Sequence, residues 1–395
     1  MSWEAYLDQN QQRFVEELLD FVRIPSVSAK PENIPDVQRA ADWVAARLTA
    51  AGAERAEVLP TAGHPVVCAE WLHAGADKPT LLIYGHFDVQ PAEPFDLWTT
   101  PPFEPEIRDG RVWGRGASDD KGGMLIPILA FEAMLRANGR LPVNVKFFFE
   151  GQEEIGSPDL PPFVAAHADR LQADMIFSAD GLQWAPGQPQ IVEALKGLVS
   201  LEIVVSGPRS DQHSGMVGGG IANPALALAH ILGGLRNADG LITVEGFYDD
   251  VIPLSDEVRA AIDRVPFPDA DLLAETGASA TWGEPGFTTK ERIFARPTLD
   301  INGLTSGWQG AGTKTVLPAV ASAKITCRLV AAQSPEAIFE AIRAHVAKHC
   351  PPGVTAEVRR NPRRADPFLV PSGHNATAVA SQPLQEAYGR APYRT

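Results

Sequence analysis

A chain of 395 residues exceeds what one ordinary hydrophobic core supports, so two domains are expected and three are possible. Hydrophobic residues make up 45% and charged residues 21% of the sequence, which excludes wholesale disorder. The 34 Lys and Arg residues face 49 Asp and Glu residues, giving a formal net charge of −15. Because nucleic acid and anionic membranes need a basic surface, neither is expected as a partner, and the short run RRNPRR (359–364) is interpreted as a solvated loop.

The N-terminal segment predicts an amphipathic helix over residues 3–22 that carries acidic residues, unlike a secretory signal peptide. No apolar run approaches the roughly 20 residues of a membrane span. The three cysteines, Cys68, Cys327 and Cys350, are odd in number and widely spaced, which argues for a reducing compartment and against a thiolate metal site. We therefore expect a soluble cytoplasmic protein.

Helix and strand patterns alternate along the first 195 residues. Continuous apolar strands separated by helices are typical of a mostly parallel sheet covered on both faces, so the expected fold class is α/β. Beyond the first helix, the pattern predicts helices over 35–51, ending at Gly52, and over 122–137, and strands over 65–71, 80–84, 143–149 and 174–178.

After residue 195 the pattern changes to strands with one polar face. Residues 198–207 and 322–330 predict two such strands, and residues 224–236 and 335–348 predict two helices. We expect a smaller α+β domain inserted into the first one. The predicted boundaries are a first domain over 1–194, an inserted domain over 195–366, and a return to the first domain over 367–395.

Acidic residues follow the strands of the first domain at the point where each strand ends. Strand 143–149 runs directly into EGQEE (150–154), strand 80–84 into GHFDV (85–89), and strand 174–178 into Asp180. Ligands of open α/β sheets bind beyond the carboxyl ends of the strands, so these side chains are expected to converge. The glycine-framed segment GRGASDDKGG (114–123) adds two further carboxylates ahead of a helix.

Each of these features has an ordinary alternative when taken alone. The glutamates would suit a solvated loop, His86 a buried structural histidine, Asp119 and Asp120 a helix cap, and Asp180 a turn. Their coincidence at strand ends favours a metal site, because clustered carboxylates repel one another unless a cation lies among them. Histidine with carboxylates favours Zn, Mn or Co, and two ions about 3.5–4 Å apart would hold a water and lower its pKa towards ~7.

Seven motifs in order along the chain resemble those of the dinuclear metallopeptidases of family 20, which include carnosine and cysteinylglycine dipeptidases, aminoacylase and glutamate carboxypeptidases. They extend over residues 84–330. DQHSG, the long 233–300 segment and GTKTVLP look most like the dipeptidase branch. The motifs are YGHFDVQP, GRGASDDKGG, EGQEEIGS, FSADG, DQHSG followed by GGG, GAGTKTVLP and CRLV.

The resemblance implies two divalent ions per subunit and a ligand set for them. Asp119 would bridge the two ions, and a cis peptide is expected between Asp119 and Asp120. Glu153 would act as general base and later as general acid. The metal ligands implied are His86, Asp119, Glu154 and Asp180.

Residues outside the ligand set also receive roles from the resemblance. Asp88 would orient His86. His213 would reach the active site of a partner subunit and stabilise the oxyanion, which implies a homodimer formed through the inserted domain. Arg328 would bind the free carboxylate of the substrate, and Thr315 would also contact the substrate. From the residues alone, Arg328 could equally form a surface ion pair.

The leading functional hypothesis is hydrolysis of a dipeptide's peptide bond by metal-activated water. The alternatives are an amidohydrolase acting on N-acyl amino acids and a truncated, inactive metal-binding homologue. The family supplies a last histidine ligand after an arginine such as Arg394, but here the sequence ends at APYRT, and His374 comes too early to match. A chain ending there is expected to bind the second ion weakly and to turn over poorly.

Overall fold

The computed structural model describes residues 1–371 and 373–395, although the side chains of Pro362 and Arg363 are not described. It forms two compact units, Met1–Leu182 and Gln183–Thr395. Among the described residues, no helix combines the length and the apolar character needed to cross a bilayer.

The first unit is built on a five-stranded sheet with the order β1-β2-β6-β3-β7. The predicted elements are present within one to two residues at most ends. The elements of this unit are α1 (Trp3–Val22), η1 (Pro31–Asn33), α2 (Ile34–Ala51), β1 (Glu54–Leu59), β2 (Val66–Trp71), β3 (Thr80–His86), η2 (Phe95–Leu97), β4 (Glu106–Arg108), β5 (Arg111–Trp113), α3 (Lys121–Asn138), β6 (Asn144–Glu150), η3 (Glu153–Ile155), α4 (Leu160–Ala166), α5 (Ala168–Leu171) and β7 (Met175–Ser178).

This sheet is mixed, which corrects the expectation of a mostly parallel one. Strand β3 pairs in parallel with β6 and β7, whereas β2 pairs antiparallel with β1 and with β6. The short 60–65 connection explains the β1–β2 pairing, because a tight connection joins antiparallel neighbours and a parallel pair needs a long crossover. Strand β1, which the sequence pattern did not reveal, supplies that hairpin.

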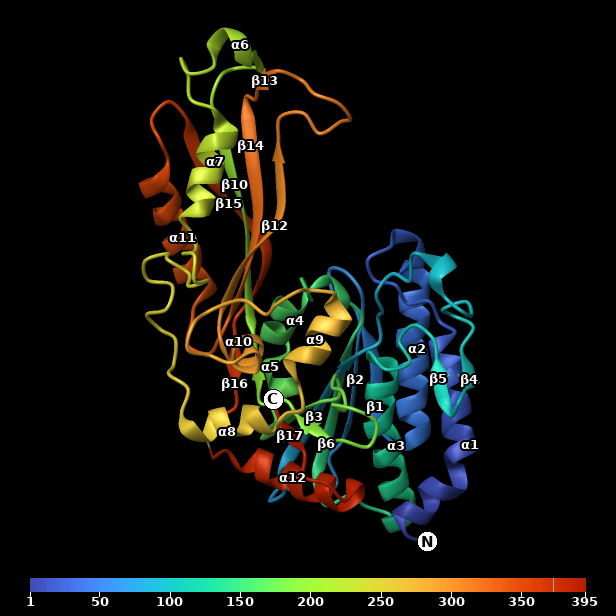
Figure 1. Cartoon of the computed structure of the whole chain (residues 1–395). Coiled ribbons are helices and arrows are strands. Elements are labelled where there is room, and N and C mark those ends of the chain that lie inside the picture. The colour runs from blue at the N-terminus through green and yellow to red at the C-terminus, as the bar shows by residue number, and fades with distance from the viewer. Residues whose placement is uncertain (372) are drawn as a thin grey trace. The chain divides into compact units, whose positions relative to one another are not determined.

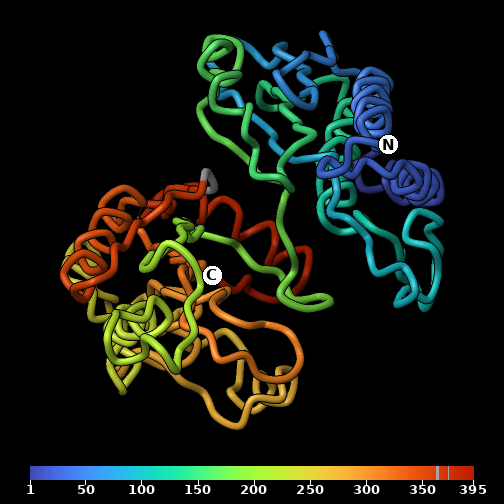
Figure 2. Tube along the Cα trace, turned by 90° about the horizontal axis from the view of Figure 1, so that it is seen from above, coloured from blue at the N-terminus to red at the C-terminus, as the bar shows by residue number. Residues whose placement is uncertain are grey.

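Helices cover both faces of the first sheet, as predicted (Figure 1). Successive side chains of β6 point to opposite faces of the sheet. Phe147 and Phe149 join the buried cluster under α2 and α3, and Phe148 points to the other face. There Phe148 stacks on Phe163 of α4, with ring centroids 5.8 Å apart. In Figure 2 the blue N-terminal helices are seen nearly end-on. Helix α2 is capped at its C-terminus by Gly52, whose φ of 105° is a left-handed conformation that glycine adopts readily.

A buried ion-pair network ties the three long helices of the first unit together. Glu132 on α3 accepts hydrogen bonds from Tyr6 (2.7 Å), Arg13 (2.8 Å) and Arg47, and Arg47 also donates to Glu17 at 2.8 Å. Burial alone would raise the pKa of Glu132, but the hydrogen bonds from Tyr6 and the two arginines outweigh it and lower that pKa.

Glu132→Gln is expected to destabilise the chain by about 3 kcal/mol, because it removes one of the two carboxylates that pair with the buried Arg47 guanidinium and leaves only Glu17. The measurement is urea unfolding at pH 7. The pKa of Glu132 is lower in the folded than in the unfolded chain. Its contribution to the free energy of unfolding is therefore fully present above the pKa of an unfolded glutamate and is lost as the pH falls through the pKa of the folded state. The exposed Glu16→Gln should shift stability by less than about 0.5 kcal/mol, and equal losses for both variants would contradict the network's importance.

The second unit contains a four-stranded antiparallel sheet with the order β12-β14-β10-β15. Helices α7 and α11 cover one face around a single buried cluster, and the other face carries the exposed Lys324 and Arg328, as the alternating pattern predicts. Its elements are β8 (Gln190–Ile191), β9 (Ala194–Leu195), β10 (Gly197–Ser206), β11 (Gln212–His213), α6 (Ser214–Val217), α7 (Pro224–Gly233), α8 (Asp256–Arg264), α9 (Asp269–Thr276), α10 (Thr289–Ala295), β12 (Thr298–Ser306), β13 (Val316–Leu317), β14 (Val320–Leu329), α11 (Pro335–His349), β15 (Thr355–Ala365), β16 (Phe368–Leu369), α12 (Asn375–Tyr388) and β17 (Tyr393–Arg394).

The segment 367–395 pairs with the beginning of the second unit. Strand β16 pairs with β9, β17 pairs with β8, and Arg394 forms an ion pair with Glu193 at 2.9 Å. The predicted domain boundaries at 194/195 and 366/367 stay predictions. The run RRNPRR lies within strand β15, so its interpretation as a loop is wrong.

Candidate metal centre

The carboxyl ends of three neighbouring strands meet at one edge of the first unit's sheet. In the register of the parallel strands, His86 at the end of β3 lies opposite Glu150 at the end of β6, and Tyr84 lies opposite Ser178 at the end of β7. The residues that follow each strand therefore emerge side by side. This arrangement explains why a buried, phenylalanine-rich strand ends in a cluster of acids.

His86, Asp119 and Asp180 form the centre of this cluster. Their nearest potential ligand atoms all lie within 4.8 Å of one another. The Nε2 atom of His86 is 3.1 Å from Oδ1 of Asp119 and 3.9 Å from Oδ2 of Asp180. The His86 side chain is fully buried, whereas the two aspartates are 63% and 42% exposed, so the group is open to solvent on one side. The peptide between Asp119 and Asp120 is cis, as expected.

Asp88 holds the surrounding side chains in place. Its backbone carbonyl lies 3.1 Å from Nδ1 of His86, so Nδ1 is the donor and Nε2 faces the cluster. The Asp88 carboxylate accepts hydrogen bonds from the backbone N–H groups of Glu153 and Glu154, both at 3.1 Å. Asp88 thus fixes the histidine through its backbone carbonyl and the two glutamates through its buried carboxylate.

The two glutamates differ in what they contact. Oε2 of Glu153 lies 4.0 Å from Nε2 of His86, and burial together with repulsion from Asp180 and Glu154 raises the pKa of Glu153 to about 7. Glu154 accepts a hydrogen bond from the amide of Gln90 at 2.7 Å, and burial raises its pKa despite this bond. Glu153 therefore has the position and the basicity of a proton acceptor beside the cluster.

Three residues around the cluster received no site role from the sequence: Gln90, Asp120 and Glu150. The buried Asp120 accepts the backbone N–H of His86 at 3.1 Å. Glu150 is fully buried and accepts hydrogen bonds from Tyr84 (2.6 Å) and Ser157 (2.9 Å). All three lie inside the motifs that carry the family resemblance. Their place beside the assigned residues in those motifs is the one sequence signal that could have identified them.

The chemistry of this donor set suits a divalent metal ion. One imidazole nitrogen and several carboxylate oxygens converge, and burial raises the pKa values of Asp180, Glu153 and Glu154. Burial alone would lower the pKa of His86, yet hydrogen bonds to Asp119 and Asp88 raise it to about 11. Carboxylates this close together are stabilised by a cation placed among them, and a divalent metal ion would supply that charge.

The second unit holds the other residues that the sequence singled out. His213 lies on β11, pairs with Val316 and accepts the N–H of Gly215 on its Nδ1 atom at 3.0 Å. The carbonyl of Thr315, the residue directly before β13, accepts the N–H of Ser214 at 3.1 Å, so Thr315 lies close to His213. Arg328 lies on β14 and is exposed.

The fold and the cluster together define a metal-dependent hydrolase of the α/β class. The model of peptidase family M20/M25/M40 matches residues 82–395, and the chain belongs to this family. It is 34% identical over 361 residues to the Cys-Gly metallodipeptidase dug1 of Schizosaccharomyces pombe, covering 87% of this chain and 74% of that protein.

Two further relatives place the chain in the same family. The human Beta-Ala-His dipeptidase is 34% identical over 361 residues, covering 86% of this chain and 70% of that protein. The crystal structure of the M20 family metallo-carboxypeptidase Sso-CP2 from Sulfolobus solfataricus superposes with a TM-score of 0.83 at 32% identity, covering 96% of this chain and 85% of that one.

Proposed function

We propose that this chain hydrolyses the peptide bond of dipeptides with divalent metal ions held by His86, Asp119, Glu154 and Asp180. The observation that carries the proposal is the convergence of His86, Asp119 and Asp180 beside Glu153, a carboxylate with a pKa of about 7. Metallodipeptidases among the relatives support the same reaction. The histidine–carboxylate donor set favours Zn, with Mn and Co as alternatives, and we propose two ions per subunit bridged by Asp119.

The metal would supply Lewis-acid polarisation of the scissile carbonyl and a lowered pKa for the attacking water. Glu153 accepts the proton of that water and returns it to the leaving amine. Asp88 keeps Nε2 of His86 directed at the site through the contact of its carbonyl with Nδ1. The backbone hydrogen bonds to the Asp88 carboxylate hold Glu153 and Glu154 in their separate positions.

Residues of the second unit are proposed to bind the substrate. Arg328 would hold the free carboxylate, because a guanidinium binds a carboxylate with two parallel hydrogen bonds. His213 would stabilise the oxyanion, and Thr315, directly before β13, would contact the substrate.

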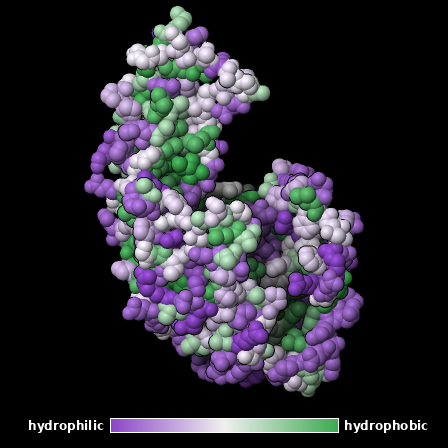
Figure 3. Space-filling model, in the orientation of Figure 1, coloured by the Kyte–Doolittle hydropathy of each residue, from purple (hydrophilic) through white to green (hydrophobic). Residues whose placement is uncertain are grey.

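We also propose that the chain forms a homodimer through its second unit. Apolar side chains gather on the surface over β12 and β14 (Figure 3), where Ile301, Leu304 and Val320 are 44%, 60% and 49% exposed. Exposed apolar groups of this kind mark interaction surfaces. Light scattering should report twice the 42.4 kDa of one chain, and a monomer at micromolar concentration would contradict the proposal.

The three free cysteines fit the proposed cytoplasmic location.

Removal and return of metal tests the function directly. Chelator-treated protein should lose hydrolysis of Cys-Gly, Ala-Gly and β-Ala-His, and Zn, Mn or Co should restore it. N-acetyl amino acids and tetrapeptides serve as comparison substrates. A dipeptide needs an acidic partner for its free α-amine, whereas an N-acyl substrate needs an apolar pocket at that position. Faster cleavage of the N-acetyl compounds would identify a deacylase, and full activity without metal would contradict the metal centre.

A further inference from the structure

A short buried segment, residues 24–28, lies beside both stretches of chain that supply the centre of the metal cluster. It follows α1, and apart from Pro25 its residues are at most 7% exposed. One of the two stretches, 86–89, contains His86 and Asp88. The other contains Asp119 and leads into α3.

Ser26 binds the backbone on both sides of Asp88. Its Oγ donates to the carbonyl of Phe87 at 2.6 Å, and its carbonyl accepts the N–H of Val89 at 2.9 Å. Val27 also forms a parallel bridge with Val89. These bonds hold the 86–89 stretch in place immediately after His86, the residue that directs its Nε2 atom at the cluster.

Lys121 ties the 24–28 segment to the start of α3. It is the first residue of that helix, two positions after Asp119, and its side chain is fully buried. Its Nζ donates to the carbonyls of Phe21 (3.0 Å) and Ile24 (2.5 Å). Carbonyls at the end of a helix lack intrahelical partners and carry partial negative charge, so a lysine amine is a favourable partner for the end of α1.

Two further contacts join the stretches to one another. The Asp120 carboxylate accepts the N–H of His86 at 3.1 Å. At Gly116 a Cβ atom would lie 2.7 Å from a methyl group of Val89 and 3.3 Å from Cδ of Lys121, so the glycine leaves room for both side chains. The 24–28 segment, the 86–89 stretch and the start of α3 therefore form a closed set of contacts.

We propose that the 24–28 segment fixes the spacing between His86 and Asp119, with Ser26 and Lys121 as positioning residues of the metal centre. Ligand atoms must lie about 2.0–2.2 Å from a zinc ion, and a site functions when its groups are held within roughly 0.5 Å of that geometry. Neither positioning residue is a ligand, and each acts through the backbone that carries one. The inference rests on the proposed metal-dependent function.

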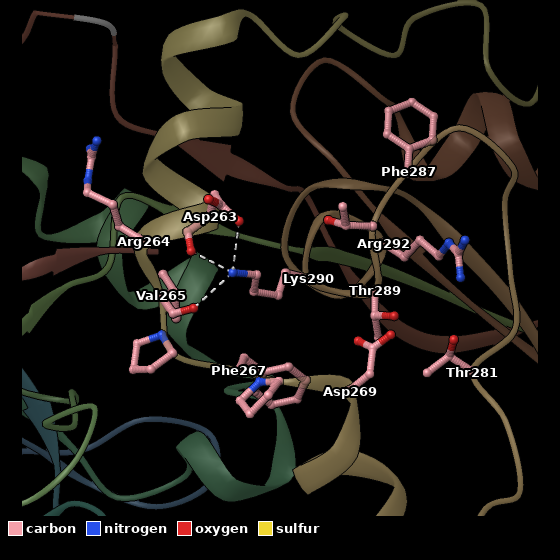
Figure 4. A pocket seen from close by; sticks show the side chains of 13 residues that line it. Asp263, Arg264, Val265, Phe267, Asp269, Thr281, Phe287, Thr289, Lys290 and Arg292 are labelled. Carbon is pink, nitrogen blue, oxygen red and sulfur yellow. Dashed lines mark hydrogen bonds and ion pairs between the residues drawn. The ribbon is translucent and has the colours of Figure 1, made fainter.

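Lys290 of the second unit provides a matched comparison for Lys121. Its Nζ also binds oxygens at the end of a helix, here α8 (Figure 4): the carbonyls of Asp263 at 2.6 Å and Val265 at 3.1 Å, and the Asp263 carboxylate at 3.3 Å. The pocket of about 650 Å³ that it lines contains none of the proposed metal ligands. Lys290→Met therefore removes the same kind of contact without altering a stretch that carries a ligand.

The first test measures zinc affinity against a competing chelator. Lys121→Met and Ser26→Ala should each weaken zinc binding by about tenfold, at the lower end of the roughly 10–100-fold seen for groups that orient ligands. Loss of a lysine near acids would by itself strengthen cation binding, so weaker binding reports displaced ligands. Both variants should also change the visible spectrum of the cobalt-substituted chain. Ser26→Ala is the milder change and serves if Lys121→Met does not fold.

Lys290→Met should bind zinc within about twofold of the native chain and keep its cobalt spectrum, although it loses a comparable set of hydrogen bonds. Native zinc affinity in both Lys121→Met and Ser26→Ala would overturn the positioning role. An equal loss of affinity in Lys290→Met would overturn it too, because the effect would then follow from general destabilisation.

Hydrogen exchange of the metal-free chain separates this inference from failure of the proposed function. The amides of His86 and Val89 donate to Asp120 and Ser26, and they should exchange about tenfold faster in Lys121→Met and Ser26→Ala but not in Lys290→Met. If the native chain binds no zinc while these amides respond in this way, the positioning of the two stretches stands and the metal-dependent function fails. If zinc binds and the amides do not respond, the positioning role is refuted.

Discussion

Glu153→Gln is expected to lower kcat for dipeptide hydrolysis by about 10²–10⁴-fold while leaving divalent metal binding within about twofold of the native chain. The amide has nearly the same size as the carboxylate but cannot accept the proton of the attacking water. Its backbone N–H can still donate to Asp88, so the arrangement of the neighbouring residues should persist. Steady-state kinetics combined with metal analysis of the purified variant measures both effects.

The matched control for this variant is Glu104→Gln, which alters an exposed glutamate of the same unit. It should retain full activity. Substantial hydrolysis by Glu153→Gln would show that another group removes the proton. A parallel loss of metal and activity would instead assign Glu153 to the ligand set.

Asp119→Ala is expected to abolish hydrolysis and to weaken metal binding by more than 100-fold. The loss should exceed the roughly 10–100-fold that accompanies removal of an outer hydrogen-bonding partner, because Asp119 lies 3.1 Å from Nε2 of His86 within the cluster itself. Zinc titration against a competing chelator measures the affinity. The control Asp77→Ala changes an aspartate whose side chain is 77% exposed and paired only with Lys78. Tight metal binding by Asp119→Ala would remove Asp119 from the centre.

Much of the metal centre could be predicted because its residues follow recognisable strands. The apolar run of β6 and the shorter runs of β3 and β7 marked three strand ends, and the structure brings the residues after them together. The glycines around Asp119 marked the fourth contribution. What sequence could not supply was the role of Asp120, because only the folded backbone shows that it accepts the N–H of His86.

The missed strands share a physical cause. Strands β1, β12 and β15 lie at sheet edges and carry many polar or exposed residues, so they lack the apolar signal of a central strand. Without β1, its hairpin with β2 could not be foreseen, and the sheet was expected to be more parallel than it is.

Anomalous diffraction at the zinc edge, from crystals grown with zinc, tests the central claim most directly. We predict a peak about 2.0–2.2 Å from Nε2 of His86 and from carboxylate oxygens of Asp119 and Asp180. Crystals with no peak at these three residues, or with zinc only elsewhere on the chain, would contradict the metal centre.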